Sequence, residues 1–108
     1  MRYNACKCLK KKAYKMNDLT QARKEIDSIN KQMAELFKKR MELSVQIAKY
    51  KMENNIPIYD KDRETAVLQQ MAELAGAELA EYTQELFITL FSLSKAYQEK
   101  LMGQENGK

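Results

Sequence analysis

Two cationic side chains share one face of a long predicted helix. Arg40 and Lys51 are 11 residues apart, a rotation of about 20° at ~100° per residue, and their Cα atoms would be about 16 Å apart. Two long side chains leaning toward each other across this gap leave room for a ligand the size of a substituted ring. Arg40 also interrupts a row of apolar positions, and a half-buried arginine is costly unless an anion meets it. The pair predicts a site for a small anion.

Arg23 is a third cation of the same helix, 17 residues before Arg40 and therefore roughly 25 Å away. It cannot reach the same ligand within its own chain. In an antiparallel pair of these helices whose twofold axis passes near residues 34 to 36, the partner's Arg23 would lie opposite residues 45 to 49, between Arg40 and Lys51. We therefore expect two identical sites in a homodimer, each completed by an arginine of the other chain.

Five further polar residues could complete such a site. Asp60, Arg63 and Glu64 stand at the start of a second predicted helix, where they could equally be a cap with first-turn charges. Ser94 and Gln98 are four residues apart on a third helix and share a face with an apolar strip, so they form a neutral polar pair. Taken singly, each of these features also fits an ordinary helix surface.

The helix that carries the three cations is long and amphipathic. It should begin after Asn17 or Asp18, either of which is a good N-cap, and end near Glu53 to Asn55. Its apolar period, with spacings of four and three, defines what we call the apolar seam: Ala22, Ile26, Ile29, Met33, Leu36, Arg40, Leu43, Ile47 and Tyr50. A helix of about 35 residues would be about 50 Å long, so it needs a partner along its length.

Two shorter helices should follow. Pro57 makes residues 56–59 an extended link, Asp60 is the expected N-cap of the second helix, and Gly76 is placed to end it. The third helix should run from about Glu78 to Met102, with a core face formed by Leu79, Tyr82, Leu86, Leu90, Leu93, Tyr97 and Leu101. The expected fold is all-α, with three helices per chain in an intertwined antiparallel homodimer.

Composition restricts the class of protein. The 108 residues include only three Gly and one Pro, which favours helices over sheet. The 19 Lys and Arg residues are interspersed with 15 Asp and Glu, so no basic stripe predicts a nucleic-acid site. There is no His, and Cys6 and Cys8 are interpreted as reduced bystanders, so no metal site is expected.

The chain should form one domain, residues 17–102, between a disordered basic extension at 1–16 and a frayed tail at 103–108. Neither a signal peptide nor a membrane span is evident, so a cytoplasmic protein that binds no membrane is expected.

Taken together, these residues resemble the all-helical chorismate mutases. The resemblance covers about residues 19 to 101, and its order and spacing are hard to reach by chance. It is carried by Ala-Arg-Lys-Glu-Ile-Asp at 22–27, Lys-Arg-Met-Glu-Leu at 39–43, Ile-Ala-Lys-Tyr-Lys at 47–51, Ile-Pro-Ile-Tyr-Asp-Lys-Asp-Arg-Glu at 56–64, and Ser94 with Gln98.

The resemblance implies the Claisen rearrangement of chorismate to prephenate, a step of the shikimate pathway toward phenylalanine and tyrosine, without a cofactor. It implies that Arg40 and the partner's Arg23 bind the two substrate carboxylates. Lys51 and Gln98 would donate hydrogen bonds to the ether oxygen, and Glu64 with the Asp60 region would hold the ring hydroxyl. Arg63 and Ser94 would complete the site.

Two other functions stay open at this point. An isochorismate pyruvate lyase or an aminodeoxychorismate mutase on the same scaffold would also bind a dicarboxylate with arginines and a lysine, although Asp60 and Glu64 suit a ring hydroxyl. A noncatalytic helical dimer that binds nucleic acid or a protein partner through the basic amino-terminal segment would instead show strongly salt-dependent binding.

Overall fold

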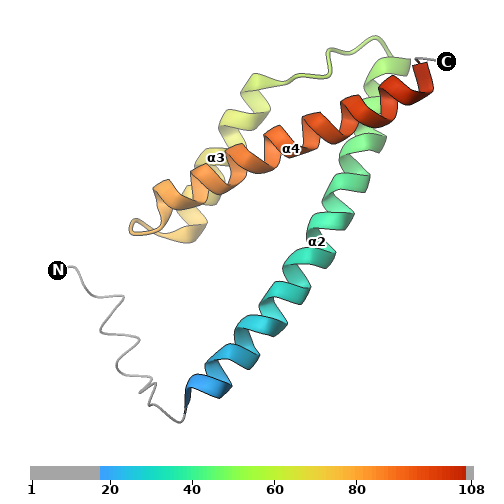
Figure 1. The fold of residues 1–108 in the computed structure, drawn as a ribbon. Helices are drawn as coiled ribbons and strands as arrows, with labels where there is room; N and C mark the ends of the chain where they lie inside the picture. The colour runs from blue at the N-terminus through green and yellow to red at the C-terminus, as the bar shows by residue number, and fades with distance from the viewer. Residues whose placement is uncertain (1–17, 107–108) are drawn as a thin grey trace. The chain divides into compact units, whose positions relative to one another are not determined.

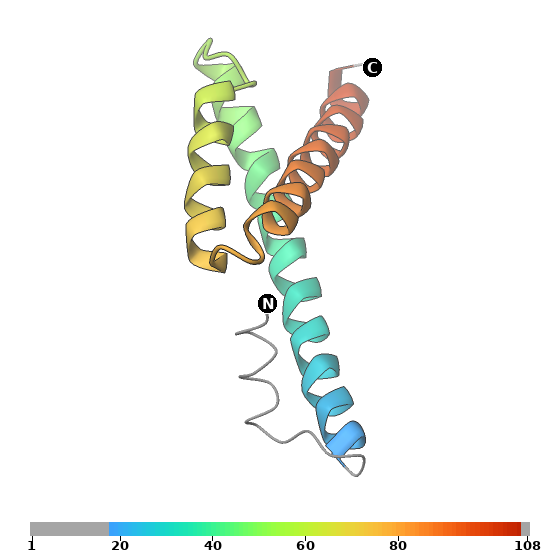
Figure 2. The ribbon, with the colours of Figure 1, turned by 90° about the vertical axis from the view of Figure 1, so that its left-hand side faces the viewer.

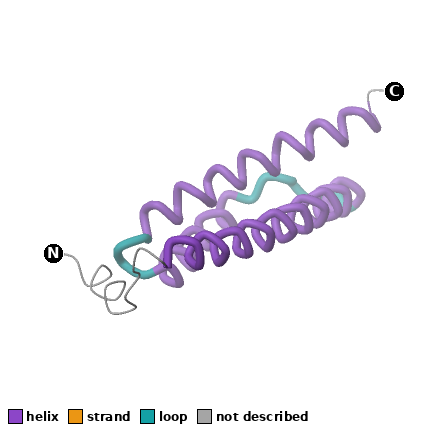
Figure 3. Tube along the Cα trace, turned by 60° about the horizontal axis from the view of Figure 1, so that its bottom comes forward, coloured by secondary structure: helices purple, strands orange, loops and turns teal. Residues whose placement is uncertain are grey.

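The computed structural model describes residues 18–106, and they form three α-helices joined by two loops (Figures 1 and 3). The helices are α2 (Leu19–Glu53), α3 (Lys61–Ala75) and α4 (Ala80–Asn106). No strand occurs in this described range, so the expected all-α class with three helices is confirmed. The proposals about residues 1–16, including Cys6 and Cys8, fall outside the described residues.

The chain divides into two compact units, and the division at Lys38 and Lys39 falls within α2. The second unit contains the carboxyl-terminal part of α2 together with α3 and α4. Within it, α3 and α4 lie side by side as a helical hairpin (Figures 1 and 2). None of the helices in residues 18–106 combines the length and apolar character needed to cross a lipid bilayer.

The end of α2 is set by a local backbone motif. Asn55 has a φ of 58°, a left-handed conformation that asparagine tolerates better than most residues. The amide of Ile56 then donates to the carbonyl oxygen of Lys51 at 2.8 Å, which satisfies a carbonyl at the helix end. Residues 56–59 continue outside any helix, so the link predicted from Pro57 is confirmed.

Both caps expected for α3 are present. Asp60 is the N-cap, and its side chain accepts a hydrogen bond from the amide of Arg63 at 3.0 Å. Gly76 follows the last residue of α3 with a φ of 91°, and its amide donates to the carbonyl oxygen of Ala72 at 3.2 Å. These two residues fix where α3 begins and ends.

The bounds of α4 differ from the expected range of 78 to 102. The amide of Leu79 donates to the carbonyl oxygen of Gly76 at 3.1 Å, so residues 77–79 form a turn and α4 begins at Ala80. At the other end the helix continues through Gly103 to Asn106. A single glycine weakens a helix without forbidding it, which is why Gly103 did not mark the end.

The face of α2 that packs within its own chain is not the apolar seam. Val45 and Ala48 are the buried residues of this helix, and neither belongs to the seam. Most seam side chains are instead half exposed or more, among them Ile26, Leu36, Ile47 and Tyr50, with exposed fractions from 55% to 63%. Its own chain therefore leaves most of the apolar seam uncovered.

The core face expected for α4 is only partly buried in the single chain, where Leu90, Tyr97 and Leu101 are half-buried. Leu79, Tyr82, Leu86 and Leu93 are all exposed. The buried residues of this helix in the described range are Ser94 and Met102, and the half-buried rings of Phe87 and Phe91 meet edge to face at 6.5 Å. Because α4 has apolar residues on more than one face, periodicity alone could not tell which face packs inside the chain.

The two described glycines should respond to alanine in opposite directions. A side chain at Gly76 would have to adopt a φ of 91°, whereas Gly103 is helical, and a Cβ at either position meets nothing within 4 Å. Gly76→Ala should therefore lower the free energy of unfolding by about 1–2 kcal/mol. Gly103→Ala should raise it by up to about 0.5–1 kcal/mol. Urea unfolding of both variants measures this, and equal shifts would contradict the caps described above.

Candidate active site

The second unit contains a cavity of about 730 Å³ that is partly open to solvent, and its size is typical of small-molecule sites. Its walls come from the carboxyl-terminal part of α2, the link before α3, the first turns of α3, and the carboxyl-terminal half of α4. Apolar side chains such as Ile47 and Val67 cover much of the wall. The charged and amide side chains that line it are Arg40, Lys51, Asp60, Arg63, Glu64, Lys95, Gln98 and Glu99.

Arg40 is half-buried and is held by two groups of α4. Its Nη1 donates a hydrogen bond to Oγ of Ser94 at 3.3 Å, and its guanidinium carbon lies 5.8 Å from the centre of the Phe91 ring. The Ser94 hydroxyl in turn donates to Sδ of Met41 at 3.5 Å. A hydroxyl and a ring face orient the guanidinium but carry no net charge, so they leave its positive charge to attract an anion.

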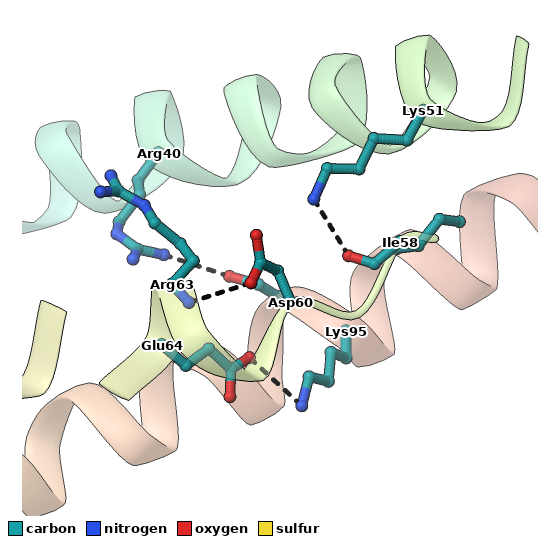
Figure 4. A network of polar contacts seen from close by, with 8 residues as sticks. Arg40, Lys51, Ile58, Asp60, Arg63, Glu64 and Lys95 are labelled. Atoms are coloured by element: carbon teal, nitrogen blue, oxygen red, sulfur yellow. Dashed lines mark hydrogen bonds and ion pairs between the residues drawn. The ribbon is translucent and has the colours of Figure 1, made fainter. Parts of the chain in front are cut away.

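Lys51 projects from the last turn of α2 toward the link. Its ammonium donates a hydrogen bond to the carbonyl oxygen of Ile58 at 3.2 Å, and Figure 4 shows it on the same side of the cavity as Arg40. The two cations that the sequence placed on one helix face therefore line the same cavity. The backbone carbonyl holds Lys51 in place without neutralising it.

Two acidic groups stand across the cavity from these cations (Figure 4). Asp60 caps α3 through Oδ1, and Glu64 follows one turn later. Oε2 of Glu64 forms an ion pair with Nζ of Lys95 on α4 at 3.3 Å. The same ammonium lies 4.1 Å from the centre of the Tyr59 ring. The link, α3 and α4 therefore converge at Lys95.

Seven of the eight residues predicted to bind substrate line this one cavity: Arg40, Lys51, Asp60, Arg63, Glu64, Ser94 and Gln98. The eighth, Arg23, is exposed and belongs to the other unit of the chain. Sequence reasoning missed Lys95 and Tyr59. Lys95 gives no periodic signal, since a lysine on a helix is usually a solvated surface residue, and its position next to Ser94 was the only hint.

The side chains that line the cavity suit the binding and polarisation of a small anionic ligand. Arg40 and Lys51 can hold carboxylates, Gln98 can donate a neutral hydrogen bond, and Asp60 and Glu64 can accept from a hydroxyl. Within the described residues, no group of three or more His, Cys, Asp or Glu side chains could hold a metal ion. A compact dicarboxylate with a hydroxyl is the ligand class that this set of groups matches.

Comparison with known proteins identifies the family of the chain. The sequence model of the family described as chorismate mutase type II matches residues 22–99, which include every residue of the predicted site. The chain belongs to the chorismate mutase type II family. The matched range also lies inside the interval 17–102 that we expected for the domain.

Curated relatives of this chorismate mutase type II chain are longer proteins. The T-protein of Haemophilus influenzae is 44% identical over 64 residues, which are 56% of this chain and 17% of that protein. The bifunctional chorismate mutase/prephenate dehydratase of Buchnera aphidicola subsp. Schizaphis graminum is 35% identical over 88 residues, 80% of this chain and 23% of that protein. The chain thus spans about a fifth of the length of these relatives. No solved structure matches it significantly.

Ser94 offers a test of how the cavity is held together. Its hydroxyl is buried, with 6% of the residue exposed, and it is the acceptor for Arg40. Ser94→Ala should lower the free energy of unfolding by about 1–2 kcal/mol, because a half-buried charged donor loses its partner. Ser92→Ala, an exposed position on the same helix, should change it by less than about 0.5 kcal/mol. Chemical denaturation measures both, and equal effects would contradict the contact.

Proposed function

We propose that the chain is a chorismate mutase, which converts chorismate to prephenate, and that it acts as an intertwined antiparallel homodimer with two identical sites. The observation that carries the proposal is the convergence of Arg40, Lys51 and Gln98 on one cavity with the acids of the α3 start. Membership of the chorismate mutase type II family supports the same activity.

The arginines bind the two carboxylates of the substrate in this proposal. Arg40 binds one, held toward the cavity by Ser94 and Phe91. The partner's Arg23 binds the other. Arg23 directly follows Ala22 of the apolar seam, so it stands at the edge of the seam, where a side chain can reach past the helix contact into a neighbouring chain. A guanidinium on each carboxylate restrains the flexible side chain of the substrate over its ring.

Lys51 and Gln98 act on the reacting bond. The rearrangement breaks the ether carbon–oxygen bond while a carbon–carbon bond forms, and negative charge grows on the ether oxygen as its bond stretches. Preorganised donors stabilise that charge. A millionfold acceleration requires about 8 kcal/mol, and one such donor contributes ~3–4 kcal/mol. No proton needs to be transferred, so a site without His is adequate.

Asp60 and Glu64 accept hydrogen bonds from the ring hydroxyl, and Arg63 and Ser94 complete the surroundings of the substrate. A hydroxyl in this position distinguishes chorismate from related dicarboxylates. Incubation with chorismate should produce prephenate, whereas an isochorismate pyruvate lyase would release salicylate and pyruvate from isochorismate. Turnover of isochorismate without turnover of chorismate would overturn the proposal.

The exposed apolar seam supports the homodimer. The seam residues of α2 that its own chain leaves uncovered include Ile26, Ile29, Met33 and Leu36, each more than half exposed. Contiguous apolar surface of this kind on a soluble helix marks an interaction site. A second copy aligned antiparallel would cover the seam with an identical seam and bring Arg23 to the neighbouring cavity.

Removing the proposed donor should affect rate much more than stability. Lys51→Ala should lower kcat by about 100- to 1000-fold, because the charge on the ether oxygen loses its strongest donor. The free energy of unfolding should fall by less than about 1 kcal/mol, since the hydrogen bond to Ile58 is exposed. Lys38→Ala removes an exposed cation of the same helix and serves as the control. Near-normal turnover of Lys51→Ala would exclude this role.

Mixing two inactive variants tests the shared site. Homodimers of Arg23→Ala and of Arg40→Ala should each lose most activity, because every site lacks one arginine. A heterodimer has one site with Arg40 from one chain and intact Arg23 from the other, so mixed subunits should recover up to about half of the wild-type activity per heterodimer. Differently tagged chains allow the heterodimer to be isolated and assayed. An isolated heterodimer as inactive as its parents would rule out a site shared between chains.

A further inference from the structure

Lys95 belongs to one of the four segments that form the cavity and contacts two of the others. It stands on α4, its ammonium pairs with Glu64 of α3 at 3.3 Å, and the same ammonium lies 4.1 Å from the ring centre of Tyr59 in the link. Lys95 also lines the cavity itself. Figure 4 shows the pair of Lys95 and Glu64 across the cavity from Arg40 and Lys51. The position of the Lys95 ammonium is therefore set by both an ion pair and a contact with an aromatic ring.

The positive charge of Lys95 offsets part of the negative charge that lines the cavity. A cavity for a dianion also contains the carboxylates of Asp60, Glu64 and Glu99, and each of them repels the ligand. Lys95 offsets the charge of Glu64, whose carboxyl oxygens can still accept a hydrogen bond. The side chains of the two partners are 44% and 25% exposed, so water screens the pair in part. A bound ligand would displace some of that water and strengthen the effect.

The same charge should discriminate between ring substituents. A hydroxyl requires only an acceptor, which Glu64 supplies whether or not a cation stands behind it. An ammonium requires a surrounding negative charge, and Lys95 reduces that charge by pairing with Glu64. A glutamate paired with a lysine is thus an acceptor for neutral donors and a poor partner for cations.

We propose that Lys95 is a positioning and specificity-determining residue, which acts through Glu64 to favour a hydroxyl over an ammonium on the ring of the bound dicarboxylate. The inference rests on the proposed function, because it concerns the substrate of that same site. Tyr59 contributes by holding the ammonium of Lys95 against Glu64. Lys95 is not itself a ligand of the substrate carboxylates, since Glu64 already neutralises its charge.

The first experiment compares two ligands that differ only in this substituent. For the wild type, Lys95→Met and Lys95→Arg, kcat and KM are measured with chorismate, and the inhibition constant is measured with 4-amino-4-deoxychorismate. In Lys95→Met the KM for chorismate should rise, and the ratio of the two affinities should shift by about fivefold or more toward the amine. Lys95→Arg should restore the ratio, because it restores the charge.

Lys100→Met is the matched control. It removes the same charge from an exposed position on the same helix, outside the residues that line the cavity, so it should leave the ratio unchanged. Any general loss of attraction for dianions affects both ligands and cancels in the ratio. Equal weakening of both ligands in Lys95→Met would overturn the proposal, and so would failure of Lys95→Arg to restore the preference.

The second experiment asks whether Lys95 acts through Glu64. In a Glu64→Gln background, Lys95→Met should shift the affinity ratio by less than twofold, because the carboxylate whose charge Lys95 offsets is gone. A full fivefold shift in that background would show that Lys95 acts independently and would overturn the proposed route. Wild-type protein that does not convert chorismate would refute the proposed function itself, whereas normal wild-type turnover with an unaltered ratio in Lys95→Met refutes only this inference.

Discussion

The half-buried guanidinium of Arg40 is the constraint on which the site depends. Its contacts in the described structure are a hydroxyl and an aromatic face, which fix its direction without offsetting its charge. A cation in such surroundings is stabilised when an anion arrives. The buried hydroxyl of Ser94 accepts a hydrogen bond from the guanidinium, and the Phe91 ring lies against it. Arg40 also lines the cavity. The packing of α2 against α4 thus serves to present one positive charge.

Helix α2 contributes both to the cavity and to the exposed apolar seam. Val45 and Ala48 are the buried residues of α2, while the long side chains of Arg40 and Lys51 line the cavity. Most apolar side chains of the seam remain exposed in the single chain, although Leu43 and Ile47 also line the cavity. The same helix therefore supplies cations to the cavity and leaves apolar surface for the proposed partner.

Sequence reasoning succeeded where the signal is local. Asp60 and Gly76 were expected to cap α3, because a capping carboxylate and a positive φ act within a few residues. It failed where two arrangements satisfy the same pattern. The exposed Leu86 and Leu93 of α4 and the buried Met102 are all apolar, so periodicity could not assign the inner face.

The polar residues of the site also differ in whether a local sequence signal marks them. Arg40 and Lys51 were found because a cation in an apolar row and a matching rotation are visible in one helix. Lys95 was missed because its importance comes from Glu64 and Tyr59, which the fold brings to it from other elements. The carbonyl of Ile58, the acceptor for Lys51, could not be predicted at all, since every residue carries one.

The uncovered seam has a thermodynamic consequence. If a second copy covers it, as proposed, most of the apolar surface of α2 leaves water only on association, so folding and assembly become one process. The midpoint of thermal unfolding then rises with protein concentration, and dilution alone shifts the population toward unfolded single chains. The free energy of unfolding of such a protein is a property of the dimer. A substitution on the seam is present in both chains, so it alters this free energy at two places in each dimer.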